Sequence, residues 1–181
     1  MTIDLKQDFF ELFALPRDYS IDRPLLENRY REIQRAVHPD KFVNASDQER
    51  RVSMQQATLV NEAYETLIDP IERGRYLLSL TGITLDEESR STQDIEFLGE
   101  QMELRESLAE IHTQAEPLAE LDKMSATMNV RMSAMESELA TRLQQSDTDE
   151  AIDLILKMQF YSKLQIEISE LEADLEDELY G

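Results

Sequence analysis

The chain has 181 residues, 41% of them hydrophobic, which is enough for one large domain or two small ones with apolar cores. It contains no cysteine, which excludes disulfides, thiolate nucleophiles and cysteine-ligated metals, and it has no apolar run of the roughly 20 residues that a membrane span needs. The net charge of −21 is uneven: residues 1–78 carry 11 Lys/Arg against 14 Asp/Glu, and residues 79–181 carry 7 against 25. Because the acidic second half repels phosphate, we expect neither nucleic acid nor a membrane as a partner.

The N-terminal sequence, MTIDLKQDFF, has neither a basic segment before an apolar stretch nor an Arg/Ser-rich amphipathic start. We therefore expect no secretory or transit peptide, and a cytoplasmic protein. Only 4 Gly and 5 Pro are available for turns, and helical spacing dominates the apolar pattern. The sequence thus predicts an all-α fold.

The first elements along the chain are two helices that end before a proline. Four apolar residues between Phe9 and Phe13 predict a short helix before Pro16. Asp22 can cap a second helix, whose apolar stripe recurs at steps of four, three and four: Leu26, Tyr30, Ile33 and Val37. Pro39 should end this helix, because the residue before a proline is pushed out of the α region.

Two more helices complete the first half. One carries the stripe Val52, Gln56, Leu59, Ala63, Tyr64 and Leu67, and a shorter one follows Pro70 and ends near Gly82. The next residues are polar without periodicity, and the charge shifts at the same place. We therefore predict a first domain at 1–82, a linker at 83–92 and a second domain at 93–181.

The second half shows three longer helical patterns. The first spans roughly residues 93–114, with Phe97, Leu98, Met102, Leu108 and Ile111 expected on one side. The second repeats Leu121, Met124, Met128, Met132, Met135, Leu139 and Leu143, and the third follows Ser146-Asp147 with Ile152, Leu156, Phe160, Leu164, Leu171 and Leu175. Each helix must bury its apolar face on the others, which predicts a three-helix bundle.

The tripeptide His38-Pro39-Asp40 could be imagined as part of a catalytic site. A hydrolytic site would also need a nucleophile or metal and an oxyanion donor, and the chain has no Gly-rich phosphate loop, no His-x-x-x-His and no cysteine pair. The other histidine, His112, lies within a predicted helix. We therefore expect no intrinsic enzymatic activity, no metal and no cofactor.

The order of elements over residues 8–78 resembles the J-domain of DnaJ-type co-chaperones: a short helix, a basic helix, His38-Pro39-Asp40, and a helix that contains the segment 61–67, NEAYETL. The resemblance implies an antiparallel helix pair with additional short helices. It also implies that the tripeptide stimulates ATP hydrolysis by a chaperone of the heat shock protein 70 family. The chemistry agrees, because proline fixes φ and Asp40 can accept a charge-assisted bond from a partner's arginine.

Basic residues surround the tripeptide: Arg29, Arg31 and Arg35 precede it, and Lys41 follows it. On most helices such charges form only a solvated face and contribute little to stability. Arg31 and Arg35 are one turn apart, however, and face away from the apolar stripe. The resemblance implies that these four residues dock on the acidic side of the chaperone's ATPase domain.

Two later segments narrow the resemblance to the HscB family of iron–sulfur cluster co-chaperones. The segment 70–80, PIERGRYLLSL, followed by Gly82, looks like the end of the HscB J-domain. The segment 97–106, FLGEQMELRE, resembles the start of its C-terminal three-helix domain. General DnaJ proteins would instead continue into a Gly/Phe-rich linker and often a Cys-rich zinc domain, and the chain has neither.

The HscB resemblance implies two partners, an HscA-type chaperone and the iron–sulfur scaffold IscU, which the C-terminal bundle binds. The matching client-binding positions are Leu98, Gly99, Met102, Glu103, Glu106, Glu110 and Phe160. Several of these step by four, so the resemblance implies an apolar patch rimmed by acid, although Leu and Met at such spacing are more often core residues. Gly99 differs from the family, where a bulky apolar residue such as Met is usual, and it removes contact area and weakens the helix.

The resulting expectation is a two-domain co-chaperone whose J-domain stimulates the HscA ATPase while its bundle delivers IscU and promotes cluster transfer. Two alternatives stay open. A generic J-protein would deliver unfolded clients to a DnaK-type chaperone and show no preference for IscU. A purely structural helical adaptor would carry its His-Pro-Asp sequence by accident.

Overall fold

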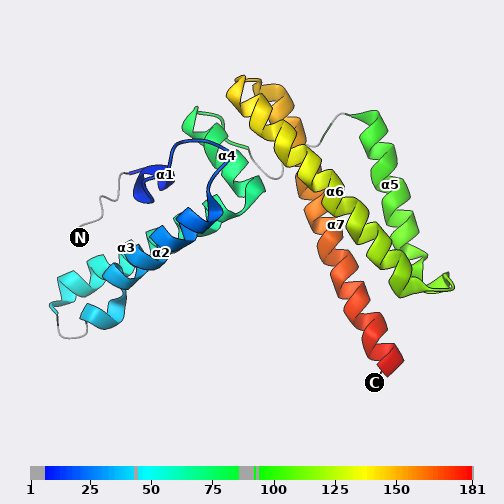
Figure 1. Cartoon of the computed structure of the whole chain (residues 1–181), viewed down its shortest axis with the longest axis horizontal. Helices are drawn as coiled ribbons and strands as arrows, with labels where there is room; N and C mark the ends of the chain where they lie inside the picture. The colour runs from blue at the N-terminus through cyan, green and yellow to red at the C-terminus, as the bar shows by residue number, and fades with distance from the viewer. Residues whose placement is uncertain (1–6, 43–44, 86–91, 93, 181) are drawn as a thin grey trace. The chain divides into compact units, whose positions relative to one another are not determined.

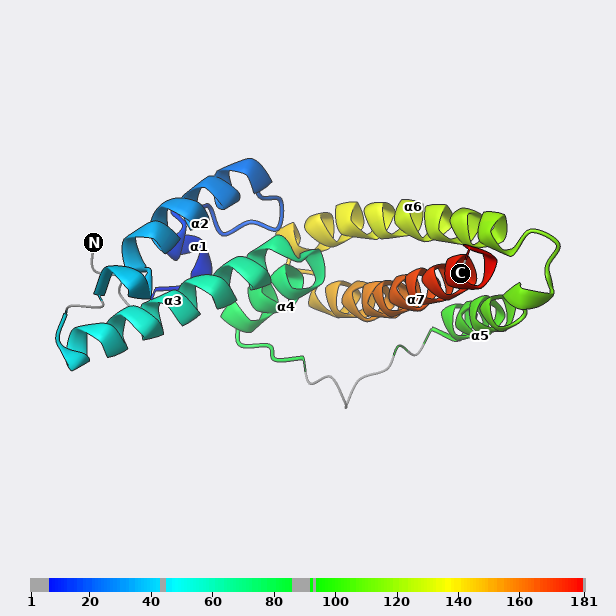
Figure 2. The ribbon, with the colours of Figure 1, turned by 90° about the horizontal axis from the view of Figure 1, so that it is seen from below.

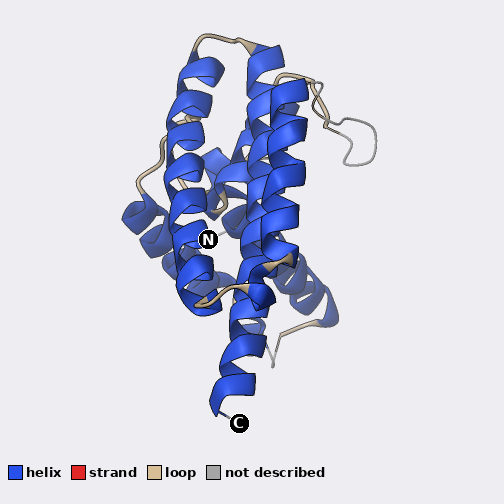
Figure 3. Cartoon of the chain, turned by 90° about the vertical axis from the view of Figure 1, so that its right-hand side faces the viewer, coloured by secondary structure: helices blue, strands red, loops and turns tan. Residues whose placement is uncertain are grey.

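The computed structural model describes residues 7–42, 45–85, 92 and 94–180, and these divide into two compact units, 1–83 and 84–181. Within the described part of the chain every regular element is a helix, as Figure 3 shows, which confirms the predicted all-α fold. Most of the predicted linker, residues 86–91, lies outside the described residues. Among the described helices, none combines the length and apolarity that a membrane span requires.

The first unit begins with a short, capped helix. Helix α1 (Phe9–Leu12) starts at Asp8, whose side chain accepts the Glu11 N–H at 2.9 Å while the Glu11 side chain accepts the Asp8 N–H. Helix α2 (Arg23–Val37) starts at Asp22, whose side chain accepts the Leu25 N–H at 2.9 Å. Both caps satisfy backbone donors that a helix leaves free at its first turn.

Helices α2 and α3 (Asp47–Ile68) pack side by side as an antiparallel pair, and α4 (Pro70–Leu80) packs back onto α3 (Figures 1 and 2). Between α2 and α3 the chain makes one turn of 3₁₀ helix, η1 (Pro39–Phe42). The core of the unit consists of Phe10, Leu12, Phe13, Leu15, Leu26, Ile33, Val37, Val60, Ala63 and Leu67. These residues hold α2 and α3 against each other, and the turn η1 that joins them is exposed.

The predicted stripe of α3 was wrong at Val52, which is 41% exposed. Its neighbour Ser53 is buried instead, and the Ser53 hydroxyl donates to the Val37 carbonyl at 2.7 Å. That carbonyl ends α2 and has no partner within its own helix, so a buried serine satisfies two polar groups at once. The bond ties α3 to the last turn of α2, directly before His38.

The second unit consists of α5 (Ile95–Ala109), a 3₁₀ turn η2 (Ile111–Thr113), α6 (Pro117–Gln144) and α7 (Thr148–Tyr180). Helices α6 and α7 pack side by side, with α5 as the third helix (Figure 2). Their shared core consists of Phe97, Leu108, Ile111, Leu121, Met128, Phe160, Tyr161, Leu164, Ile168 and Leu175. This confirms that the three apolar faces pack together.

The expected apolar face of the first bundle helix was partly wrong. Phe97, Leu108 and Ile111 are buried, but Leu98 and Met102 are 40% and 74% exposed. At about 100° per residue, Leu98 lies about 100° around the helix from Phe97 and Met102 about 140°, so both point away from the bundle. The helix is also shorter than predicted, because η2 replaces its last turn.

Candidate functional site

The His-Pro-Asp turn is a defined local structure. His38 ends α2 with φ −57° and ψ 127°, an extended conformation that the following proline requires. The Asp40 N–H donates to His38 Nδ1 at 3.3 Å, and the Lys41 N–H donates to the His38 carbonyl at 3.0 Å. The turn therefore holds Asp40 at a fixed position on η1, next to the histidine ring.

The Asp40 carboxylate is available to a partner. Its side chain is 86% exposed, and one of its oxygens lies 3.6 Å from His38 Nδ1. Within the part of the chain that the structure describes, no arginine or lysine forms an ion pair with Asp40. A carboxylate presented in this way can accept bidentate bonds from a guanidinium group.

The basic residues of α2 do not form one cluster. Arg35 lies opposite the buried stripe, in the last turn of the helix, and has no ion pair among the described residues. Arg31, on the same face, contacts Glu27 at 3.3 Å. Arg29 lies about 160° around the helix from Arg31 and pairs with Glu32 at 3.8 Å. The structure thus brings Arg31 and Arg35 together and separates Arg29 from them. Lys41 is exposed directly after the turn.

The outer face of α5 carries exposed apolar side chains. Besides Leu98 and Met102, Ile95 at the start of the helix is 84% exposed. Its spacing of three and seven residues from Leu98 and Met102 places it on the same face. Sequence reasoning missed Ile95, although that spacing could have identified it. Gly99 lies between these three residues and is also exposed.

Acidic residues continue this outer face toward the end of α5. Glu103, Glu106 and Glu110 are all exposed, and Glu110 is the residue that ends the helix. Glu106 and Glu110 follow Met102 at steps of four, so they extend the same line along the helix. The face is therefore apolar in its first two turns and acidic in the last two.

Phe160 does not belong to this exposed face. It is only 9% exposed, and its ring packs edge-on against Phe97 with centroids 5.6 Å apart. The Arg105 guanidinium, from α5, lies over the Phe160 ring, 5.7 Å from its centroid. In this structure Phe160 therefore supports α5 from beneath.

A polar triad joins the three helices of the bundle. The Arg131 guanidinium of α6 pairs with the Glu100 carboxylate of α5 and donates to the Tyr161 hydroxyl of α7 at 2.8 Å. The Tyr161 hydroxyl donates in turn to Glu100 at 2.8 Å. Each hydrogen-bonding group of the tyrosine is thereby used, although its ring is almost fully buried. The triad fixes the position of α5, and with it the exposed face.

A second network anchors the start of α5. Lys157 Nζ lies 2.6 Å from an Asp94 oxygen and 2.8 Å from an Asp153 oxygen, and the buried Thr92 hydroxyl donates to Asp153 at 2.7 Å. The hydrogen bond from Lys157, aided by the Phe97 N–H, lowers the pKa of Asp94. Burial acts to lower the pKa of Lys157, but the bonds and charges of Asp153 and Asp94 outweigh it and raise the pKa overall.

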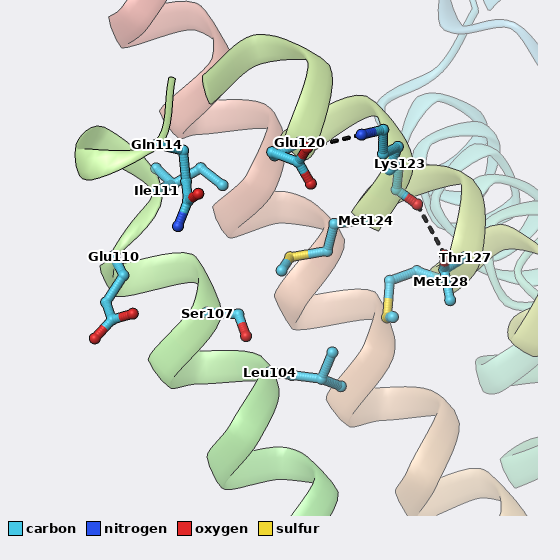
Figure 4. Close-up of a pocket in the computed structure, with 10 residues that line it drawn as sticks. All are labelled: Leu104, Ser107, Glu110, Ile111, Gln114, Glu120, Lys123, Met124, Thr127 and Met128. Carbon is cyan, nitrogen blue, oxygen red and sulfur yellow. Dashed lines mark hydrogen bonds and ion pairs between the residues drawn. The ribbon is translucent and has the colours of Figure 1, made fainter. Parts of the chain in front are cut away.

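A pocket of about 370 Å³ lies between α5, η2 and α6 (Figure 4). Its apolar lining includes Leu104, Ile111, Met124 and Met128, and Glu110 stands at its outer edge. The cation at its rim, Lys123, is already paired with Glu120 at 2.7 Å. Among the described residues, no group of three or more acidic or histidine side chains is arranged to hold a metal ion.

Comparisons with known proteins agree with this architecture. A family model, the HSCB C-terminal oligomerisation domain, matches residues 93–169. The co-chaperone protein HscB homolog of Shewanella woodyi is 43% identical over 171 residues, 93% of this chain and 98% of the relative. The chain belongs to the HscB co-chaperone family. This confirms the predicted family, whose members are named as co-chaperones rather than enzymes.

Solved structures of the family match the fold over nearly the whole chain. Chaperone HscB from Vibrio cholerae has 39% identity and a TM-score of 0.85, and the match covers 93% of this chain and 99% of that one. Human co-chaperone HscB has 33% identity and a TM-score of 0.87, with 95% and 85% covered. The fold is thus an N-terminal J-like region followed by a C-terminal helical domain.

Proposed function

We propose that this chain recruits an HscA-type chaperone through its first unit and an IscU-type iron–sulfur scaffold through its second. The observation that carries the proposal is the similarity to HscB co-chaperones over 93% of the chain. Two exposed features give it a physical basis: the carboxylate of Asp40 on the His-Pro-Asp turn, and the apolar and acidic face of α5.

On the chaperone side, Asp40 accepts a charge-assisted bond from an arginine of the partner ATPase. Arg31 and Arg35 attract the acidic surface of that ATPase and speed association, with Lys41 beside the turn and Arg29 at the edge of the contact. The chain performs no chemistry itself. Its bound turn biases the partner toward the conformation that hydrolyses ATP.

On the client side, the scaffold contacts Leu98, Gly99 and Met102 with an apolar surface, while its basic residues approach the carboxylates of Glu103, Glu106 and Glu110. Phe160 contributes by supporting α5 and Arg105. A chain that holds both partners raises the effective concentration of the scaffold at the chaperone. ATP turnover then promotes release of the cluster, which belongs to the scaffold, in the cytoplasm.

A binding experiment with Met102→Ala tests the client half of this proposal. Calorimetric titration of the full chain with an IscU-type scaffold should show roughly tenfold weaker binding for the variant, the loss expected for an anchor at the centre of an interface. Val130→Ala on α6 is a matched control, because Val130 is 72% exposed in the same unit but lies on another helix. It should bind like the wild type.

The same titration separates the proposal from a generic J-protein. A reduced, denatured protein should bind more weakly than the folded scaffold and should not displace it. Unchanged scaffold binding by Met102→Ala, or equal binding of denatured protein, would contradict the proposed client.

A further inference from the structure

Four residues on the outer face of α5 have the spacing of a helix-packing socket. Ile95, Leu98, Gly99 and Met102 stand at positions i, i+3, i+4 and i+7. Where helices pack closely, four residues with this spacing surround the hole that receives one side chain of the facing helix. On α5 the hole faces away from the bundle, since its three large side chains are exposed.

Gly99 deepens this socket, and nothing among the described residues requires a glycine there. Its backbone lies inside α5 without a positive φ, and a Cβ added at this position would meet no atom of the described part of the chain within 4 Å. A glycine inside an exposed helix is unfavourable relative to alanine. The open space over the Gly99 backbone therefore allows a close approach from outside the molecule.

The charges around the socket define what it can receive. Glu96 and Glu103 are exposed on one side of it and Glu106 follows it along the helix, while the nearby Arg105 is held over the Phe160 ring. Residues 79–181 as a whole carry 7 basic against 25 acidic side chains. A second copy of this chain would bring like charges together, whereas a basic surface is attracted.

We propose that Ile95, Leu98, Gly99 and Met102 form a socket for one large apolar side chain that projects from a basic surface of the client. The proposal rests on the proposed function, since it assigns the partner of the same face. It adds Ile95 as a contact residue and makes the missing side chain of Gly99 a recognition feature. The inserted side chain contacts the Gly99 backbone and is enclosed by the three apolar side chains.

The opposite interpretation of Gly99 is that it merely loses contact area. The two interpretations predict opposite effects of adding a side chain. If the socket is occupied by the client, Gly99→Met fills it and weakens binding. If Gly99 only reduces the apolar contact area, Gly99→Met restores that area and strengthens binding.

Calorimetric titration of the full chain with an IscU-type scaffold decides between them. We expect Gly99→Ala to weaken binding about fivefold and Gly99→Met more than tenfold, and Ile95→Ala about fivefold to tenfold. Ala126→Met, on the exposed surface of α6, controls for added bulk, and Val130→Ala controls for lost apolar area; both should bind like the wild type. Thermal unfolding should show both Gly99 variants to be at least as stable as the wild type, which excludes misfolding as the cause.

The outcomes distinguish failure of the socket from failure of the proposed function. Suppose that the wild type binds the scaffold and that Met102→Ala weakens this binding. If Gly99→Met then binds as tightly as the wild type or more tightly, the socket is wrong, but the client face is still supported. Unchanged binding by Ile95→Ala overturns its role in the socket. If the wild type does not bind the scaffold, both proposals fall.

Discussion

Replacing Tyr161 by phenylalanine should loosen α5 without disturbing the core. The ring stays buried against Phe97, and only the hydroxyl of the triad with Glu100 and Arg131 is removed. This hydroxyl of α7 hydrogen-bonds to side chains of both α5 and α6. Its loss should therefore weaken the attachment of α5, the helix that presents the proposed client-binding face.

The magnitude follows from the two lost hydrogen bonds, each 2.8 Å long and each to a charged group. Such a bond contributes about 1.5–3 kcal/mol when it is well buried. The Glu100 and Arg131 side chains are 30% and 40% exposed and stay paired with each other, so water replaces part of the loss. We therefore expect the free energy of opening α5 to fall by about 1–2 kcal/mol.

Hydrogen exchange of the full chain measures this locally, because each peptide reports its own helix. The α5 amides should exchange about 5- to 30-fold faster in Tyr161→Phe, while α2 and α3 serve as internal controls in the other unit. Tyr64→Phe is the matched variant, since the Tyr64 hydroxyl makes no hydrogen bond within the described residues, and it should leave α5 unchanged. An exchange rate of α5 within twofold of the wild type would refute the role assigned to the triad.

Asp94→Asn keeps an N-cap side chain but removes the charge that Lys157 contacts, so we expect a small loss of stability at pH 7, measured by urea unfolding. The lowered pKa of Asp94 stabilises the fold above the pKa of an unfolded aspartate, and this contribution is lost as the pH falls through the lower pKa of folded Asp94. The difference should therefore shrink progressively from about pH 5 toward about pH 1, and a difference that stays constant over this range would contradict the assignment. Ala14 and Ser146 have positive φ of 51° and 59°, a conformation that glycine adopts more easily than other residues. Ala14→Gly and Ser146→Gly should therefore each stabilise the chain by about 1 kcal/mol in thermal unfolding. A loss of stability in either variant would count against backbone strain at that turn. Arg35→Glu should slow association with an HscA-type chaperone most strongly at low salt, and a salt-independent effect would exclude steering.

Local chemistry made the helix ends predictable. Asp22 caps α2 and the proline after His38 ends it, as the sequence predicts, because caps and proline act within a few residues. The HscB family could also be predicted from the sequence, because the motifs that identify it are continuous segments of the chain.

The orientation of the helix faces was harder to predict from the sequence. Leu98 and Met102 fit an apolar stripe, and only packing shows that they are exposed while the neighbouring Phe97 is buried. Ser53, and not Val52, faces the core because the Ser53 hydroxyl donates to a backbone carbonyl of another helix. A contact between two helices cannot be read from the local sequence pattern. The roles of the individual site residues in binding stay predictions.

We propose that His38-Pro39-Asp40 signals to a partner ATPase, and a steady-state ATPase assay of an HscA-type chaperone is the decisive test. The wild-type chain should raise the rate, and further in the presence of an IscU-type scaffold, whereas Asp40→Asn should abolish the stimulation and leave scaffold binding intact. Asp47→Asn is the matched control, since that side chain is 81% exposed, close to the 86% of Asp40, in the same unit but outside the turn. Full stimulation by Asp40→Asn would show that the tripeptide does not act on the partner ATPase through this carboxylate.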